Sequence, residues 1–418
     1  MKRTFSLSIL LVPSGLGLVA ATYGLVRLAS GLYLPDVQAD LGLGVATAGL
    51  VSSGASVVYC LGALAGLLLA ARHARALVVG AAATAGGGAV GMALAPDVPT
   101  FALLAVLASA GAGLTSPAMV ALLQQDPSTR ERPAAQAAVN SGTGPGLVAA
   151  GALALLLLPD WRAAWAWSGL FTVLVAGLVL ASSRNGAGSA GDSARGVLPA
   201  TWWVAHARVV AAALLLGAGS AAVWSYGRAM LVDAGTGRTA SVGAWIAVGV
   251  GGTLVAASSR RMERIGPRAS WALTAGVVAL ATATLALLPA VTPIALAACA
   301  AFGWGFVAAS GALIVWTIEI DEARGASGTA LLFVVLVLGQ AVGSSVIGVL
   351  VPAAGYAAAF LAAAGVSAVG GLVAVHVRRS PRGQRSGPWP RPARRNRAGG
   401  AATRGRPGAD PGRSRRTG

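Results

Sequence analysis

The sequence predicts an all-α membrane protein with twelve transmembrane helices in two pseudo-symmetric six-helix bundles. Apolar segments of about 20 residues, the length that crosses a bilayer, recur about twelve times along the chain. Of the 418 residues, 56% are hydrophobic and 11% are charged, and the mean hydropathy is +0.73. Backbone groups in lipid must hydrogen-bond within their own segment, so these spans are expected to be helical.

The spans are expected near residues 9–34, 45–70, 76–95, 99–123, 134–158, 162–182, 207–231, 240–259, 269–289, 293–316, 326–351 and 354–377. Lys2 and Arg3 precede the first span, as they would precede a secretory signal. The apolar run then continues to Leu34, which is too long for a signal segment and favours an uncleaved first helix. Almost no residues remain for a soluble domain.

Basic residues gather on one side of these spans. That side holds Lys2, Arg3, Arg72, Arg75, Arg130, Arg132, Arg184, Arg195, Arg208, Arg260, Arg261, Arg264, Arg268 and Arg324. On the opposite side the predicted turns carry Arg162 and Arg238. Such a bias predicts a multi-pass protein of the plasma or inner membrane with both termini in the cytoplasm.

The expected organisation is a first bundle over 1–181, a cytoplasmic linker over 182–206, a second bundle over 207–377 and a basic tail over 378–418. The tail carries 13 of the 31 basic residues beside a single acid, Asp410. Because it is rich in Arg, Pro and Gly, it is expected to be disordered. A solvated topology anchor or a contact with lipid headgroups suits it better than a nucleic-acid partner.

The two halves share features at matching places. Each first helix carries a Tyr followed closely by an Arg, at Tyr23 and Arg27 and at Tyr226 and Arg228. Each half also has a basic loop after its second helix and a glycine-rich fifth helix. Repeated halves around a cytoplasmic linker are typical of a transporter whose site lies between two bundles.

On these features the chain resembles the major facilitator superfamily over residues 8–377. The run Gly252…Arg260-Arg261…Gly266-Pro267-Arg268 looks like the loop motif of that superfamily, as does Trp161-Arg162-Ala163-Ala164-Trp165 at the start of the sixth helix. The acid that the loop motif usually carries is replaced by Ala256, and by Ala70 in the first half. Residues 23–43, YGLVRLASGLYLPDVQADLGL, are similar to the YbfB-like bacterial permeases.

Arg27 and Arg228 are the strongest site candidates, because an arginine inside a span is costly unless it pairs, snorkels or faces water. The organophosphate antiporters of the superfamily place one Arg on each of the same two helices. That resemblance implies a clamp in which two guanidinium groups bind one anion. Two alternatives are structural pairing with Asp36 or Asp233, and snorkelling to lipid headgroups.

Further residues could contact a substrate or couple its movement to an ion. Tyr23, Tyr226, Asn140 and Gln340 are the other substrate-binding candidates, although the two amides could equally join helices. No acid lies in the middle of a predicted span, so Asp36, Asp233 and Glu319 remain as candidates for gating or coupling. Each of these acids could instead be a helix-end charge.

The expected function is secondary active transport of a small solute, with an organic anion as one substrate class. No phosphate-binding loop is present, and no nucleophile–base pair or metal-ligand set appears in the spans, so we expect neither an enzyme nor a cofactor. Gly144-Pro145-Gly146 resembles the motif of proton-linked exporters, which makes a multidrug or metabolite efflux permease the alternative. A non-transporting membrane sensor is the alternative of another class. We expect a monomer in the bilayer that binds no nucleic acid.

Overall fold

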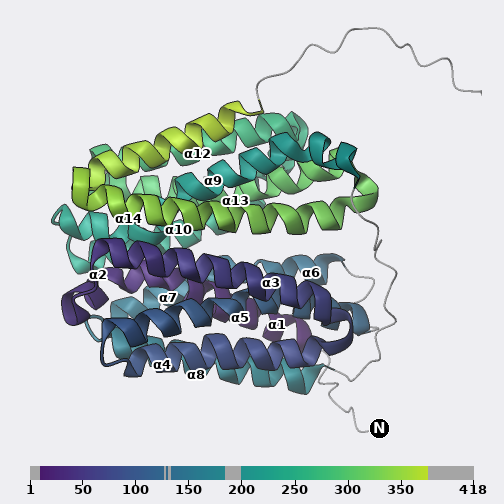
Figure 1. Ribbon diagram of the computed structural model, residues 1–418, viewed down its shortest axis with the longest axis horizontal. Helices are drawn as coiled ribbons and strands as arrows, with labels where there is room; N and C mark the ends of the chain where they lie inside the picture. The colour runs from purple at the N-terminus through teal and green to yellow at the C-terminus, as the bar shows by residue number, and fades with distance from the viewer. Residues whose placement is uncertain (1–9, 127–128, 130–132, 184–198, 375–418) are drawn as a thin grey trace, which may run out of the picture. The chain divides into compact units, whose positions relative to one another are not determined.

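The computed structural model describes residues 10–126, 129, 133–183 and 199–374, and every regular element among them is helical. The first half, residues 10–183, contains α1 (Leu11–Val19), η2 (Ala20–Leu28), α2 (Ala29–Leu41), α3 (Val45–Ala81), η3 (Ala82–Gly87), α4 (Gly88–Leu94), α5 (Val98–Gln125), α6 (Pro133–Asn140), α7 (Thr143–Leu157) and α8 (Trp161–Ser182). The second half, residues 199–374, contains α9 (Ala200–Asp233), α10 (Arg238–Thr253), α11 (Val255–Ile265), α12 (Pro267–Leu287), α13 (Thr292–Ile320), η4 (Glu322–Arg324) and α14 (Gly325–Leu372). Figure 1 shows α1–α8 side by side, in purple and blue, below α9–α14, in teal to yellow.

Ten helical segments of the described residues are long and apolar enough to cross a membrane. Two of them are far longer than one crossing needs, Val45–Leu94 with 50 residues and Ser327–Leu372 with 46. At a rise of about 1.5 Å per residue, each would extend for roughly 70 Å, more than twice the hydrocarbon thickness. Each is interrupted by a residue with non-helical backbone angles, His73 in the first and Gly355 in the second.

The first helix is longer than the sequence predicted. The structure continues it from α1 through the π-helical η2 and into α2, as far as Leu41 rather than Leu34. Pro35 does not end it; the helix ends at Gly42, which adopts the left-handed conformation (φ 72°) and donates its N–H to the carbonyl of Gln38. This extension puts Asp36 and Asp40 on the helix.

Two other segments differ from the prediction in detail. α9 begins at Ala200, after Pro199, so residues 200–206, which were expected in the linker, are helical. The predicted fifth span is present as Ala135–Leu157, and it is divided at Ser141 and Gly142 into α6 and α7. The linker residues 184–198 and the tail 378–418 lie outside the described residues.

Glycines allow the helices of the first half to approach one another closely. A Cβ on Gly24 of η2 would overlap the backbone of Gly146 on α7, and one on Gly146 would overlap the backbone of Ala20. The Gly-Pro-Gly run of the fifth helix therefore serves helix packing, which is the general role of small residues between membrane helices.

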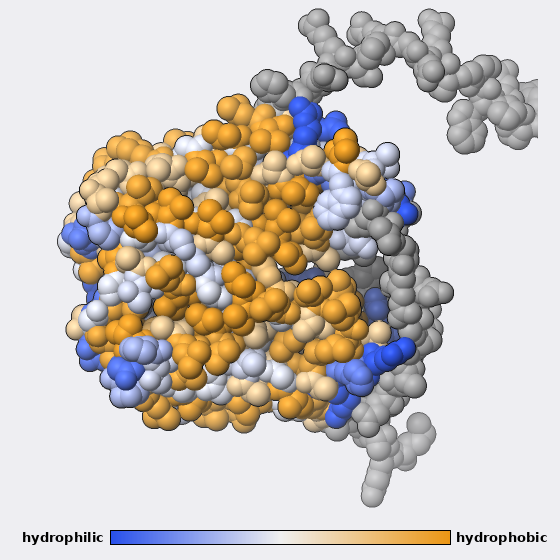
Figure 2. Space-filling view, in the orientation of Figure 1, coloured by the Kyte–Doolittle hydropathy of each residue, from blue (hydrophilic) through white to orange (hydrophobic). Residues whose placement is uncertain are grey.

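The surface is apolar around the helices. Figure 2 shows hydrophobic residues covering most of the visible face, with hydrophilic residues gathered toward its two ends. Large apolar side chains are exposed on several helices, among them Leu68 at 72%, Leu156 at 80% and Leu280 at 69%. An exposed apolar belt of this kind is expected where a protein faces lipid.

Candidate functional site

A buried ion pair joins the two halves of the chain. Arg228 on α9 pairs with Asp36 on α2, and the two side chains are only 3% and 11% exposed. Arg228 also donates from Nη1 to the carbonyl of Leu32 at 2.6 Å and from Nε to Oγ of Ser241 at 3.3 Å. Three acceptors from both halves therefore hold this guanidinium in position.

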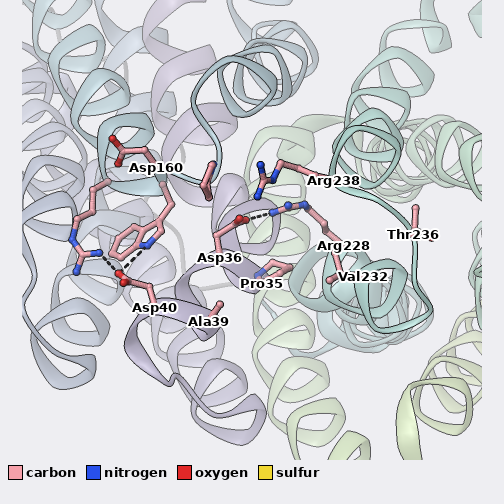
Figure 3. Close-up of a pocket in the computed structure, with 12 residues that line it drawn as sticks. Pro35, Asp36, Ala39, Asp40, Asp160, Arg228, Val232, Thr236 and Arg238 are labelled. Atoms are coloured by element: carbon pink, nitrogen blue, oxygen red, sulfur yellow. Dashed lines mark hydrogen bonds and ion pairs between the residues drawn. The ribbon is translucent and has the colours of Figure 1, made fainter.

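The pair lies at the wall of an open pocket of about 620 Å³. Figure 3 shows the side chains of Asp36, from α2, and Arg228, from α9, pointing toward each other and in contact. The charged lining consists of Asp36, Asp40, Asp160, Arg162, Arg228 and Arg238. Three acids and three arginines thus line the pocket, and their formal charges balance.

A second ion pair lies at the rim of this pocket. Asp40 accepts from Arg162 and from the indole N–H of Trp161, the latter at 3.2 Å. Arg162 also donates to the carbonyl of Ala95 at 3.0 Å and lies over the Trp161 ring. Because Arg162 and Asp40 are 36% and 47% exposed, this pair contributes little to stability. It joins the end of α2 to the start of α8 within the first half.

A second contact between the halves, here called the seam, consists of Tyr226 on α9, Val45 and Gly49 on α3, and Ser344 and Gly348 on α14. Tyr226 donates to the carbonyls of Val45 and Ser344, each at 3.2 Å, which links α9 to α3 and α14. A Cβ on Gly49 would lie 2.5 Å from the Tyr226 hydroxyl, and one on Gly348 would lie 2.7 Å from it. Tyr226 is fully buried, so the structure makes it part of the contact between the halves.

Arg27 lies in a different environment. It is half-buried on η2, its Nη2 donates to Oε1 of Gln340 at 3.1 Å, and its Cζ lies 4.5 Å from the centre of the Tyr59 ring. The Tyr23 hydroxyl lies 3.0 Å from both the Tyr59 hydroxyl and Oγ of Ser116. Within the described residues, no carboxylate forms an ion pair with Arg27.

Arg27 and Arg228 lie at different depths, although they occupy matching places in the two halves of the sequence. A Cβ on Gly31 would overlap the carbonyl oxygen of Trp224, so Gly31 and Trp224 lie at the same height along their two helices. Arg27 precedes Gly31 by four residues, and Arg228 follows Trp224 by four. Since the Leu32 and Asp36 contacts show that the helices run in the same direction, the two backbones differ in depth by about 12 Å.

The remaining candidates lie apart from these groups. Asn140 is exposed on α6, where it accepts from Gln136 at 3.0 Å. Asp233 is exposed at the end of α9, and Glu319 is exposed near the end of α13; neither forms an ion pair with a described residue. Of the predicted site residues, the structure thus brings together Tyr23, Arg27 and Gln340 in one group and Asp36 with Arg228 in another.

The sequence alone did not indicate a site role for Ser241, Ser116 or Asp40. Ser241 and Ser116 are unremarkable in sequence, because their roles depend on which helices meet. Asp40 could have been found, since Arg162 is one of two arginines on its side of the predicted spans and needs a partner there.

Comparisons with known proteins agree with this architecture. The model of the Major Facilitator Superfamily matches residues 16–335. A search of curated proteins finds no match. Among solved structures, the nucleoside transporter NupG is similar with a TM-score of 0.73 at 15% identity, over 89% of this chain and 98% of that one. A D-xylose–proton symporter has a TM-score of 0.70 at 17% identity, over 88% of this chain and 96% of that one.

A peptide transporter, POT, has a TM-score of 0.72 at 13% identity, over 88% of this chain and 93% of that one. At such identities these likenesses establish the fold and leave the substrate open. The family match covers most of the chain, and the described residues include ten helical segments long and apolar enough to cross a membrane. The chain is a transporter that belongs to the Major Facilitator Superfamily.

Proposed function

We propose that this transporter is a secondary carrier for a small organic anion, with Arg27 as the group that binds the anionic end of the substrate. The observation that carries the proposal is the charge of Arg27. A guanidinium in the middle of a membrane helix costs several kcal/mol unless it is compensated. The described contacts of the Arg27 guanidinium are with an amide oxygen and an aromatic ring, and no described carboxylate pairs with it, so a bound anion would supply the missing charge.

The groups around Arg27 suit recognition of an anion. Gln340 and Tyr59 hold the guanidinium from two sides, which reduces the entropy lost when a ligand binds. Its other N–H groups can form the two parallel hydrogen bonds that carboxylates and phosphates accept. Tyr23 contributes a hydroxyl next to Tyr59, so Tyr23, Arg27 and Gln340 form the proposed substrate contacts.

Arg228 has a different proposed role. Asp36 balances the charge of Arg228, so Arg228 does not complete a two-arginine clamp on the substrate. The pair instead holds the two halves together at the end of the protein where the pocket lies. In alternating access, one end of the contact between two bundles opens as the other closes. Breaking the Arg228–Asp36 pair would let the two halves separate at the end where the pocket lies, so Asp36 is the proposed gating acid.

The proposal includes twelve crossings. The interruptions at His73 and Gly355 would divide the two longest helices into two spans each. The first bundle would then end near residue 181, and the second would begin with α9. We place the chain in the inner membrane with both termini in the cytoplasm, as the distribution of basic residues predicts.

Uptake into proteoliposomes tests the substrate class. Radiolabelled aromatic and aliphatic carboxylates are compared with their neutral amides at equal concentration. A nucleoside and D-xylose, named for the similar structures, serve as uncharged comparators. We expect uptake of at least one carboxylate and a loss of uptake when the same molecule carries an amide. Efficient uptake of the neutral members alone would contradict the anion proposal and leave the assignment as a transporter intact.

A further inference from the structure

α11 carries a strongly basic face. Arg260, Arg261 and Arg264 are all exposed, and at 100° per residue they occupy an arc of about 100° around the helix. Arg268, also exposed, follows at the start of α12, but its guanidinium lies over the Trp316 ring of α13, 5.9 Å from the ring centre, so it is not part of this face. None of these four arginines forms an ion pair with a described carboxylate. One acid, Glu263, shares the helix with them and is likewise exposed.

The opposite face of α11 holds the helix on the protein. Trp304 on α13 donates its indole N–H to Oγ of Ser258 at 2.9 Å. Ser270 on α12 donates to the carbonyl of Met262 at 2.8 Å, and Met262 is half-buried. Since Ser258 and Met262 lie on the side of the helix away from the arginines, the basic face is directed outward from the second half.

The depth of α11 can be estimated from the neighbouring spans. The apolar segment before it, Arg238–Ser258, has 21 residues, and so does the segment after it, Pro267–Leu287. Each therefore covers about 31 Å, one hydrocarbon thickness. Arg260, Arg261 and Arg264 follow Ser258 by two, three and six residues, about 3–9 Å along the helix. The headgroup layer beyond the hydrocarbon is about 5–8 Å thick, so the guanidinium groups fall within it.

Apolar side chains next to the arginines support this depth. Leu254 is 55% exposed and Ile265 is 44% exposed, one at each end of α11. A helix with exposed apolar residues beside a basic face is the usual form of an interfacial helix that binds anionic lipid. Guanidinium groups bind phosphates through two parallel hydrogen bonds.

We propose that α11 forms a binding surface for anionic phospholipid headgroups, with Arg260, Arg261 and Arg264 as the phosphate contacts. This surface is independent of the substrate that the carrier moves. Its occupant is a lipid of the surrounding bilayer because Arg260, Arg261 and Arg264 are exposed on the outward face of α11, at the level where phosphates are most concentrated.

The test is a titration of purified full-length protein in mixed micelles. Fluorescent phosphatidylglycerol is the probe and phosphatidylcholine is the uncharged comparator. We expect phosphatidylglycerol to bind more tightly, and the Arg260→Gln/Arg264→Gln variant to weaken that binding by about fivefold for each arginine removed. Replacing the same two residues with Lys should retain most of the affinity, since the charge remains.

Glu263→Gln is the matched control on the same helix. It removes a negative charge from the surface, so binding of phosphatidylglycerol should tighten; general damage to α11 would weaken it instead. If the double Gln variant does not fold, the salt dependence of the wild-type protein decides, because raising NaCl from about 0.05 to 0.5 M should abolish the preference for the anionic lipid. Equal affinity for the two lipids at low salt would overturn the proposal, as would full displacement of the probe by soluble inorganic phosphate.

Discussion

Arg228 and Asp36 form a buried ion pair between α9 and α2. Among the described residues, it is the one ion pair that joins the two halves of the chain. We expect Arg228→Gln and Asp36→Asn each to destabilise the closed arrangement, because each leaves a buried charge without its partner. Losing one member of a buried pair costs about 3–5 kcal/mol. The melting temperature and the uptake rate of the single variants measure this loss.

The double variant, Asp36→Asn with Arg228→Gln, tests whether the two side chains stabilise the protein as a pair or independently of each other. It should recover most of the stability that either single change loses, since no unpaired charge remains. Asp233→Asn is the matched control, because Asp233 is exposed and unpaired among the described residues. Additive losses in the double variant would mean that the two side chains do not act together.

A glycine contact between α3 and α14 allows the halves to close. A Cβ on Gly49 would meet the Tyr226 hydroxyl and, at 2.6 Å, the carbonyl of Ser344. We therefore expect Gly49→Ala to hold the halves apart at this seam. Cys60, whose Sγ lies 3.7 Å from the carbonyl of Val334 on α14, should then react faster with a maleimide.

This labelling is measured in a Cys299→Ser background, so that Cys60 is the single thiol. Gly276→Ala on α12 is the control, because a Cβ there meets nothing within 4 Å. It should leave the reactivity of Cys60 unchanged. The same rate in all three proteins would show that the Gly49 contact does not govern closure.

The two interruptions in the long helices give a test of topology. We expect a Cys at position 73 and one at position 355 to be labelled by a membrane-impermeant maleimide from opposite sides of the membrane. Position 73 should react from the cytoplasmic side and position 355 from the other. Labelling of both from one side would exclude the twelve-crossing arrangement.

Asp97 caps the start of α5 by accepting from the backbone N–H of Thr100 at 2.9 Å. This hydrogen bond lowers the pKa of the Asp97 carboxyl below its usual value. A lowered pKa means that the folded state favours the carboxylate, so the stabilisation is present near neutral pH and is lost as the pH falls through the folded pKa. Asp97→Ala should lower the melting temperature at pH 7, and the difference from wild type should shrink in acid. Asp97→Asn should retain the cap.

Hydropathy predicted the architecture because lipid leaves few alternatives to apolar helices, and that constraint is visible in any 20 residues. The partner of Arg228 was less certain, with Asp36 and Asp233 both proposed. Asp233 follows Arg228 by five residues on one helix, and neighbours on a helical face are three or four apart, so helix geometry already disfavours it. The choice of Asp36 required knowing that the first helix continues past Pro35 to Leu41.

The different depths of Arg27 and Arg228 could not be predicted. Tyr23 and Arg27 lie on the π-helical stretch η2, whose register differs from that of an α-helix, and nothing in the apolar sequence marks it. The alignment of Gly31 with Trp224 depends on contacts between segments almost 200 residues apart. The sequence indicated that both arginines matter, and only the packing of the helices distinguishes a paired arginine from one without a carboxylate.

Binding of a transported carboxylate to Arg27 variants tests the central claim most directly. We expect Arg27→Gln to weaken binding about 10- to 100-fold, the loss of a charge-assisted hydrogen bond, and Arg27→Lys to weaken it less. Arg72→Gln, an exposed arginine at the turn of α3, is the matched control and should bind as wild type does. Isothermal titration of the purified variants gives the affinities, with melting curves to confirm folding. Equal affinity of Arg27→Gln and wild type for the carboxylate would contradict the account.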